Sequence, residues 1–161
     1  MAVGSASWSF TEEDFGAITR TLNKFLAETN ARCALLVDRS GQLVATVGEQ
    51  PQFDATAFAT LTAADFSANA QLAQLVGESD FNSLFHQGEK ESMYLADVAK
   101  RVILVALFDN RTTLGLVRLK IKDTVLELTK LFHDVFTRSK SAAQQPGLLA
   151  GADDEIDQLF G

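Results

Sequence analysis

Residues 33–49 read CALLVDRSGQLVATVGE, which places two apolar runs on either side of a polar turn. The turn is Asp-Arg-Ser-Gly at residues 38–41, and Gly41 can adopt the positive φ that such a turn needs. The pattern predicts a β-hairpin whose strands span residues 32–38 and 42–47.

A helix is predicted on each side of this hairpin. Before it, Thr11 can cap a helix that ends near Asn30, and the acidic residues 12–14 fall in the first turn, where the helix dipole favours anions. Apolar residues then recur at helical spacing, at Phe15, Ile18, Leu22, Phe25 and Leu26. After the hairpin, residues 54–76 are rich in alanine, contain neither Gly nor Pro and stop at Gly77, which predicts a second helix.

Three further strands and a third helix follow. Residues 81–87, 92–98 and 101–109 have strand character, and the last run is apolar at every position from 102 to 108. A continuous apolar run of this length is typical of a central strand that is covered on both faces. Residues 112–138 then predict a helix, with an apolar stripe at Leu114, Val117, Ile121, Val125, Leu128, Phe132 and Val135.

The chain of 161 residues suits one domain with tails. We expect a loose arm at residues 1–10 and a folded domain at residues 11–138. Residues 139–152 are rich in Ser, Ala, Gln and Gly and contain Pro146, which predicts a flexible linker. An amphipathic acidic segment at residues 153–161 follows.

The charge balance restricts the partners. Fourteen Lys and Arg residues against 21 Asp and Glu residues give a net charge of -7, which argues against nucleic acid and anionic membranes. The first residues carry no basic region or long apolar run, and the longest apolar run has only the length of a strand. We therefore expect a cytoplasmic protein without membrane insertion.

Few residues could carry chemistry. Cys33, His86 and His133 have no partner at a metal-ligand spacing, and a single cysteine excludes an internal disulfide. The GxSxG, P-loop and GxGxxG motifs are absent. A small hydrolase that uses Ser92 or Cys33 with His86 is an alternative, but no third group or oxyanion motif accompanies these residues. The sequence therefore predicts a protein that is not an enzyme and uses no metal or cofactor.

The second predicted helix carries two apolar stripes on roughly opposite sides. The first consists of Ala57, Leu61, Ala64, Ala68, Leu72 and Leu75, and the second of Ala55, Ala59, Phe66, Ala70 and Ala73. A helix on the surface of a domain needs one such stripe, so two stripes indicate two packing surfaces, such as its own sheet and another chain. The alternative is that alanine is simply a good helix former and needs no partner.

The C-terminal residues 153–160, DDEIDQLF, place Ile156, Leu159 and Phe160 at i, i+3 and i+4 among four acidic residues. Eight residues do not hold a helix alone, but they could form a short turn that docks an apolar edge into a groove of a partner. We interpret them as a docking segment. The alternative is an acidic tail that aids solubility.

Three stretches resemble the Roadblock family of dynein light chains and small-GTPase regulators. They are LLVDRSGQLVATVGE at 35–49, LTAADFSANAQLAQLVGE at 61–78 and FDNRTTLGLVRLKI at 108–121. The similarity covers about residues 10–138. It implies an α/β sandwich in the order α-β-β-α-β-β-β-α, with one five-stranded antiparallel sheet. The second helix is expected on one face, and the first and third helices on the other.

The resemblance also implies a homodimer in which the two second helices form a platform for one Ras-like small GTPase. We expect the platform to include Ala57, Leu61, Ala64, Ala68, Gln71 and Leu72, and the docking segment to act through Ile156, Leu159 and Phe160. Relatives of this kind stimulate GTP hydrolysis without an arginine finger, promote nucleotide exchange through a C-terminal segment, and act at a cell pole in polarity and gliding motility. The alternative within the same fold is a scaffold that recruits partners without changing the GTPase rate.

Overall fold

A computed structural model describes residues 10–143 of the chain, with side chains described as far as residue 138. Three helices and five strands follow the expected order α-β-β-α-β-β-β-α. The elements are α1 (Glu12–Thr29), β1 (Cys33–Asp38), β2 (Leu43–Gly48), α2 (Ala55–Leu75), β3 (Ser83–Gln87), β4 (Ser92–Val98), β5 (Val102–Phe108) and α3 (Leu114–Ala143).

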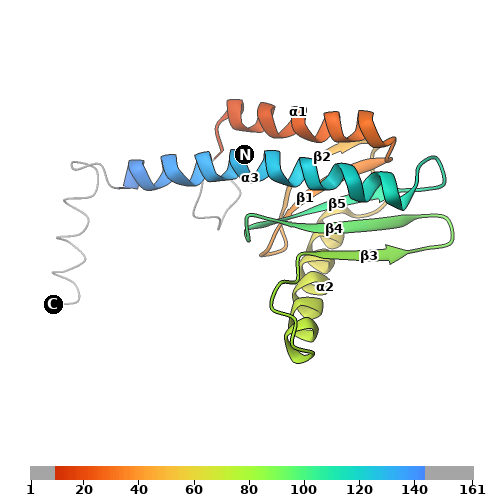
Figure 1. The fold of residues 1–161 in the computed structure, drawn as a ribbon. Coiled ribbons are helices and arrows are strands. Elements are labelled where there is room, and N and C mark those ends of the chain that lie inside the picture. The colour runs from red at the N-terminus through yellow and green to blue at the C-terminus, as the bar shows by residue number, and fades with distance from the viewer. Residues whose placement is uncertain (1–9, 144–161) are drawn as a thin grey trace.

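The five strands form one sheet in the order β2-β1-β5-β4-β3, and every neighbouring pair is antiparallel. The all-apolar strand β5 lies at the centre, as its sequence predicts. Figure 1 shows α1 and α3 together on one side of the sheet and α2 on the other. The predicted fold class, with one helix on one face and two on the other, is therefore confirmed.

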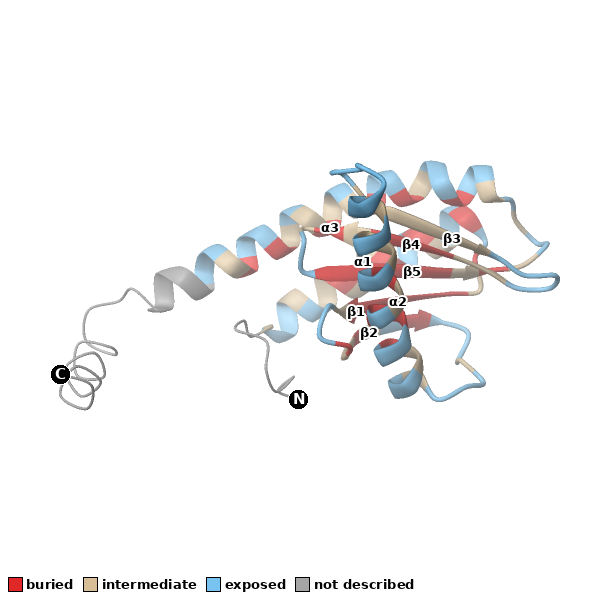
Figure 2. Cartoon of the chain, turned by 90° about the horizontal axis from the view of Figure 1, so that it is seen from below, coloured by how far each residue is buried: buried red, intermediate tan, exposed pale blue. Residues whose placement is uncertain are grey.

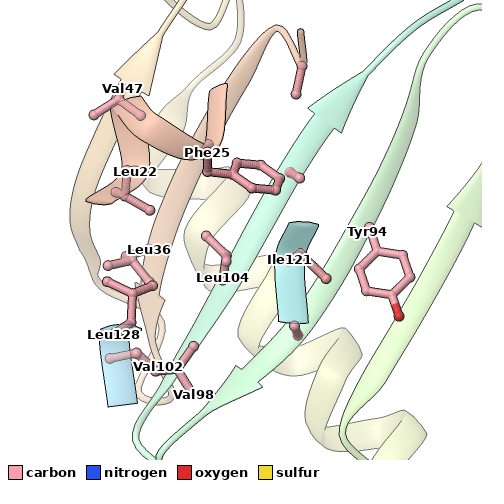
Figure 3. Close-up of a cluster of buried hydrophobic side chains, with 14 of the residues drawn as sticks. Leu22, Phe25, Leu36, Val47, Tyr94, Val98, Val102, Leu104, Ile121 and Leu128 are labelled. Atoms are coloured by element: carbon pink, nitrogen blue, oxygen red, sulfur yellow. The ribbon is translucent and has the colours of Figure 1, made fainter. Parts of the chain in front are cut away.

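Alternating side chains of the central strands supply two separate cores, because successive residues of a strand point to opposite faces. On the first face, Leu36 and Leu104 pack with Phe25 of α1 and Leu128 of α3, as Figure 3 shows. On the second face, Leu35 and other strand residues pack under α2. The hairpin, predicted from its two apolar runs, thus contributes to both layers.

Two elements have ends that differ from the prediction by more than one residue. Helix α3 continues to Ala143 rather than ending near residue 138, so residues 139–143 of the expected linker are helical. Neither Gly nor Pro occurs in those five residues, and Ala142 and Ala143 favour helix, so nothing there stops α3. Strand β3 begins at Ser83 rather than at residue 81, and the Phe81 ring before it packs on the Phe66 ring with their centroids 4.9 Å apart.

Candidate functional site

The surface of interest is built on α2, which begins at a well-formed cap. The Asp54 carboxylate accepts hydrogen bonds from the backbone N–H groups of Thr56 and Ala57, at 3.0 and 3.2 Å. These bonds satisfy two donors that the first turn of a helix leaves free. The hairpin turn supports the same end of α2: Gly41 has φ +96°, and a Cβ there would come within 3.2 Å of the Thr60 Cα. This close approach fixes the helix on the sheet.

One side of α2 faces the sheet. Ala59, Thr62, Ala63 and Phe66 are its buried residues, and the apolar ones among them pack with residues of β1, β4 and β5. Ala59 and Phe66 belong to the second predicted stripe, and the other members of that stripe are half-buried. Ala59 and Phe66 of this stripe therefore contact the protein's own sheet.

The opposite side of α2 is exposed. All six expected platform residues lie there: Ala57, Leu61, Ala64, Ala68, Gln71 and Leu72. Leu61 is 69% exposed and Leu72 is 58% exposed. Leu75 and Val76, at the end of the helix, are 83% and 78% exposed and extend the same apolar surface. Figure 2 shows this helix lying in front of the sheet, with its outer side open to solvent. We call these eight residues the α2 platform.

A large exposed apolar surface of this kind marks an interaction site more often than it marks a defect of the fold. The structure shows where this surface lies on α2, and its role as a platform for a GTPase stays a prediction. Val76 was not predicted to belong to this surface, although it is an apolar residue next to Leu75, the last residue of the stripe.

A polar cluster joins α2 to the edge strand β3. The Asp65 carboxylate lies 2.7 Å from Nε2 of His86, and its other oxygen accepts a hydrogen bond of 2.9 Å from the Asn69 amide. The sequence showed only that His86 has no partner at a metal-ligand spacing, and this contact with Asp65 was not predicted. Asp65 and Asn69 share one strip of the helix, but nothing in the sequence indicates which strand faces that strip.

Two arginines in loops are held by acidic side chains. Arg39, in the hairpin turn, forms an ion pair with Asp97, whose side chain is only 7% exposed, and its guanidinium lies 5.3 Å from the centroid of the Phe66 ring. Arg111 precedes α3 and donates hydrogen bonds to Asp109 and Glu49, at 3.0 and 3.1 Å. Both arginines are therefore engaged within the protein.

These bonds also stabilise the charged forms of the carboxylates. Hydrogen bonds from Arg32 and then from Arg111 lower the pKa of Glu49, and the bond from Arg111 lowers the pKa of Asp109. The four side chains form a connected surface network between the end of β2 and the start of α3. Its geometry is that of a structural clamp between two loops.

The residues of the alternative hydrolase do not form a catalytic pair. Cys33 lies on β1, which β5 and β4 separate from His86 on β3. Ser92 lies on β4 beside β3, but it is in register with Gln87 whereas His86 is in register with Met93, so Ser92 and His86 point to opposite faces of the sheet. Burial raises the pKa of the Cys33 thiol to about 11, so this side chain stays protonated at neutral pH. Among residues 10–143 there is no group of three potential metal ligands, and no helix is long and apolar enough to cross a membrane.

The expected docking residues Ile156, Leu159 and Phe160 lie outside the described residues. So do the first nine residues of the arm and residues 144–152 of the expected linker.

This arrangement, a five-stranded sheet with one exposed helix on one face and two helices on the other, defines a Roadblock domain. The chain belongs to the Roadblock/LC7 domain family, whose model matches residues 18–108. Within that family it is similar to MglB proteins. It shares 44% sequence identity with Myxococcus xanthus MglB, over 74% of this chain and 98% of that chain, with a TM-score of 0.71.

Two further solved structures of MglB proteins are also similar to this chain. The gliding protein MglB from Thermus thermophilus is 31% identical over 81% of this chain and 98% of its own, with a TM-score of 0.75. An MglB with a tetrameric arrangement is 30% identical over 81% of this chain and 98% of its own, with a TM-score of 0.76. A comparison with curated proteins gave no match.

Proposed function

We propose that this protein is a homodimeric regulator of a Ras-like small GTPase of the MglA type and stimulates GTP hydrolysis by that GTPase. The exposed α2 platform carries this proposal, because it is a mainly apolar surface on a helix whose other side already packs on the sheet. The similarity to MglB proteins, which extends over most of the chain, supports the same conclusion.

The dimer forms through the edge of the sheet beside α2. Strand β3 is the last strand on that side and pairs only with β4, so one row of its backbone hydrogen-bonding groups has no partner strand within the described part of the chain. Pairing of two β3 strands would extend the sheet across a two-fold axis and bring the two α2 helices close together. One similar MglB has a tetrameric arrangement, so self-association occurs among the relatives.

Stimulation proceeds through the conformation of the GTPase. The platform binds the hydrolysis-competent state more tightly than the resting state and so raises the population of the competent state. The protein supplies no arginine finger. We regard Arg39, in the hairpin turn, and Arg111, before α3, as the most finger-like arginines by position. Asp97 holds Arg39, and Asp109 and Glu49 hold Arg111.

The C-terminal segment provides a second contact. Ile156, Leu159 and Phe160 bind a different surface of the same GTPase and promote nucleotide exchange. Because the segment is tethered to a chain that already holds the GTPase, even a weak contact is occupied.

GTP turnover by a purified MglA-type GTPase, measured with and without this protein, tests the proposal. We expect turnover to rise with this protein and to level off when the GTPase is saturated. Unchanged turnover in the presence of demonstrated binding would support the alternative, a scaffold that recruits partners without changing the rate.

A further inference from the structure

A groove lies on the opposite face of the sheet from the α2 platform, between α3 and the neighbouring strands β3 and β4. Its volume is about 370 Å³, within the range of small ligand and peptide sites. Tyr94 and Ala96 of β4 form one wall and Ile121, Val125 and Leu126 of α3 form the other. Tyr94 and Ile121 extend from neighbouring elements into the same layer in Figure 3. We call this the α3–β4 groove.

The groove is mainly apolar and open at its rim. Ala96 and Ile121 are buried at its base, whereas Leu126 is 62% exposed. Leu119, nearer the start of α3, is 61% exposed and adds to the apolar surface of that helix. Helix α3 therefore presents uncovered leucines although its other side packs on the sheet.

Two cations border this groove. Arg118 and Lys122 are one turn apart on α3, and the Arg118 guanidinium lies 6.0 Å from the centroid of the Tyr94 ring. Among the residues with described side chains, neither forms an ion pair. Asp97 is the one acidic residue that lines the groove, but its side chain points to the α2 face of the sheet, where it pairs with Arg39 and Lys100. A positive rim around an apolar groove is unusual in a protein of net charge -7, and it favours an acidic, apolar occupant.

The chain itself contains a segment with these properties. Residues 153–160, DDEIDQLF, combine four acids with Ile156, Leu159 and Phe160 at the spacing of one helical edge. Leu126 lies seventeen residues before the end of α3 at Ala143, about 26 Å along the helix. The ten peptide units from Ala143 to Asp153 span up to about 33 Å when extended, so the segment can return to the groove of its own chain.

We propose that residues 153–160 dock in the α3–β4 groove of the same chain, with their apolar edge against Val125 and Leu126 and their acids beside Arg118 and Lys122. This docking requires no GTPase and is independent of the proposed function. If the proposed function also holds, docking withholds the segment from the GTPase until the GTPase competes for it.

Paramagnetic relaxation in the full-length protein tests this placement. A nitroxide is attached at Gln158→Cys, a position off the apolar edge, while buried Cys33, whose pKa burial raises to about 11, stays unlabelled. We expect loss of the amide signals of Tyr94, Val125 and Leu126, and recovery of those signals when the nitroxide is reduced. Signals of α2, on the other face of the sheet, should remain.

Matched variants identify the contacts. Lys122→Glu and Arg118→Glu should restore the groove signals, whereas Lys130→Glu, the same charge change on the α1 side of the same helix, should not. Replacing Ile156, Leu159 and Phe160 with Ala should also restore them. The three α3 variants change exposed residues, and unchanged spectra of the core will verify the fold of every variant.

Three results would overturn the proposal. The first is the absence of signal loss in the unsubstituted groove. The second is signal loss that Lys130→Glu relieves as fully as Lys122→Glu, which would indicate nonspecific charge attraction. The third is signal loss seen in a mixture of nitroxide-labelled and isotope-labelled chains but not within one chain, which would assign the groove to a second copy.

Discussion

The Arg39 guanidinium lies 5.3 Å from the centroid of the Phe66 ring, and the same side chain forms an ion pair with nearly buried Asp97. Three elements meet at this point: the hairpin turn, the buried side of α2 and the end of β4. An arginine whose charge neutralises a buried carboxylate and whose plane covers an aromatic ring has a structural role. It is poorly placed to leave the protein and enter the nucleotide site of a partner.

Replacing Arg39 with Ala should therefore affect stability more than GTPase stimulation. Loss of the partner of Asp97 leaves a desolvated carboxylate with only Lys100 nearby, and we expect unfolding free energy to fall by about 1–3 kcal/mol. The reduction in stimulated GTP turnover should be far smaller than the factor of about 10³ that an arginine finger is worth. Urea unfolding and turnover assays measure the two effects. Arg111→Ala is the matched control at the surface, and a finger-sized loss in either variant with binding intact would contradict the conformational mechanism.

The α2 platform should tolerate charge in the isolated chain but not in the complex. Ala64 and Ala68 are exposed, so Ala64→Arg or Ala68→Arg should leave the circular dichroism spectrum unchanged. Each change should weaken dimerisation, GTPase binding or both, because it places a charge in an apolar contact. Mass in solution and binding assays measure this.

Gln74→Arg provides the control for these two variants. Gln74 lies on the same helix and is exposed, but it is on a different side from the apolar stripe. It should behave like the parent protein. If Ala64→Arg and Ala68→Arg also dimerise and stimulate the GTPase like the parent, the placement of the platform is wrong.

Ending the chain at Ala143, where α3 ends, should preserve the fold and the dimer. Stimulation of hydrolysis should largely persist, while nucleotide exchange and GTPase affinity fall, because the tethered second contact is lost. The triple change of Ile156, Leu159 and Phe160 to Ala should reproduce the effect, whereas neutralising the four acids should reproduce it only in part. If the nucleotide exchange rate and the affinity for the GTPase are the same with and without the segment, at low salt and with matched nucleotide, the segment is only a solubility tail.

The Cys33 thiol should be unreactive in the folded protein. Burial raises its pKa from 9.0 to about 11, so the thiolate is scarce at pH 8 and the sulfur is also shielded. Because the folded-state pKa is the higher one, this group contributes stability below pH 9 that is lost as the pH rises toward 11. Alkylation rates with and without urea, and unfolding at about pH 8 and about pH 11, measure both effects. Cys33→Ala should show a smaller loss of stability over that pH range; an equal loss would assign the alkaline effect to other groups.

Two glycines with positive φ allow the energetic cost of backbone strain to be measured separately from that of steric crowding. Gly77 has φ +88° and open space around it, so Gly77→Ala should cost about 1 kcal/mol from backbone strain alone. Gly48 has φ +94°, and a Cβ there would lie 2.5 Å from the Arg32 carbonyl oxygen and 2.8 Å from the Leu26 Cδ1. Gly48→Ala should therefore destabilise the protein clearly more than Gly77→Ala in urea unfolding. Equal losses would show that the end of β2 can shift at little cost.

Local pattern was sufficient to predict the elements and their order. The apolar run of β5 identified the central strand, and the spacing of Ala59 and Phe66 against Leu61 and Leu72 identified the two sides of α2. These signals are strong because burial depends directly on periodicity. The layer arrangement came from the family resemblance rather than from periodicity.

Contacts between distant residues were not predictable in the same way. The pairing of Asp65 with His86 depends on which strand lies under which part of α2, and that of Arg39 with Asp97 depends on the order of the strands in the sheet. The end of α3 was misplaced for a different reason: serine and lysine at residues 139–141 resemble linker composition, yet no residue there prevents a helix from continuing. The sequence indicated an apolar surface on α2 but not its full extent through Val76.

The buried residues of α2 all lie in its first twelve positions, up to Phe66, and no residue of the last nine is buried. That second half is less closely packed, so it depends more on its own backbone hydrogen bonds and on the helix preference of its alanines. Its amide hydrogens should consequently exchange with solvent faster than those of the first half, and a partner on this surface should slow them. The entropy cost of ordering those turns reduces the free energy of binding. Because glycine raises that cost, Ala70→Gly would weaken association although Ala70 is not a platform residue. The intrinsic helicity of α2 thus sets affinity separately from the chemistry of its surface.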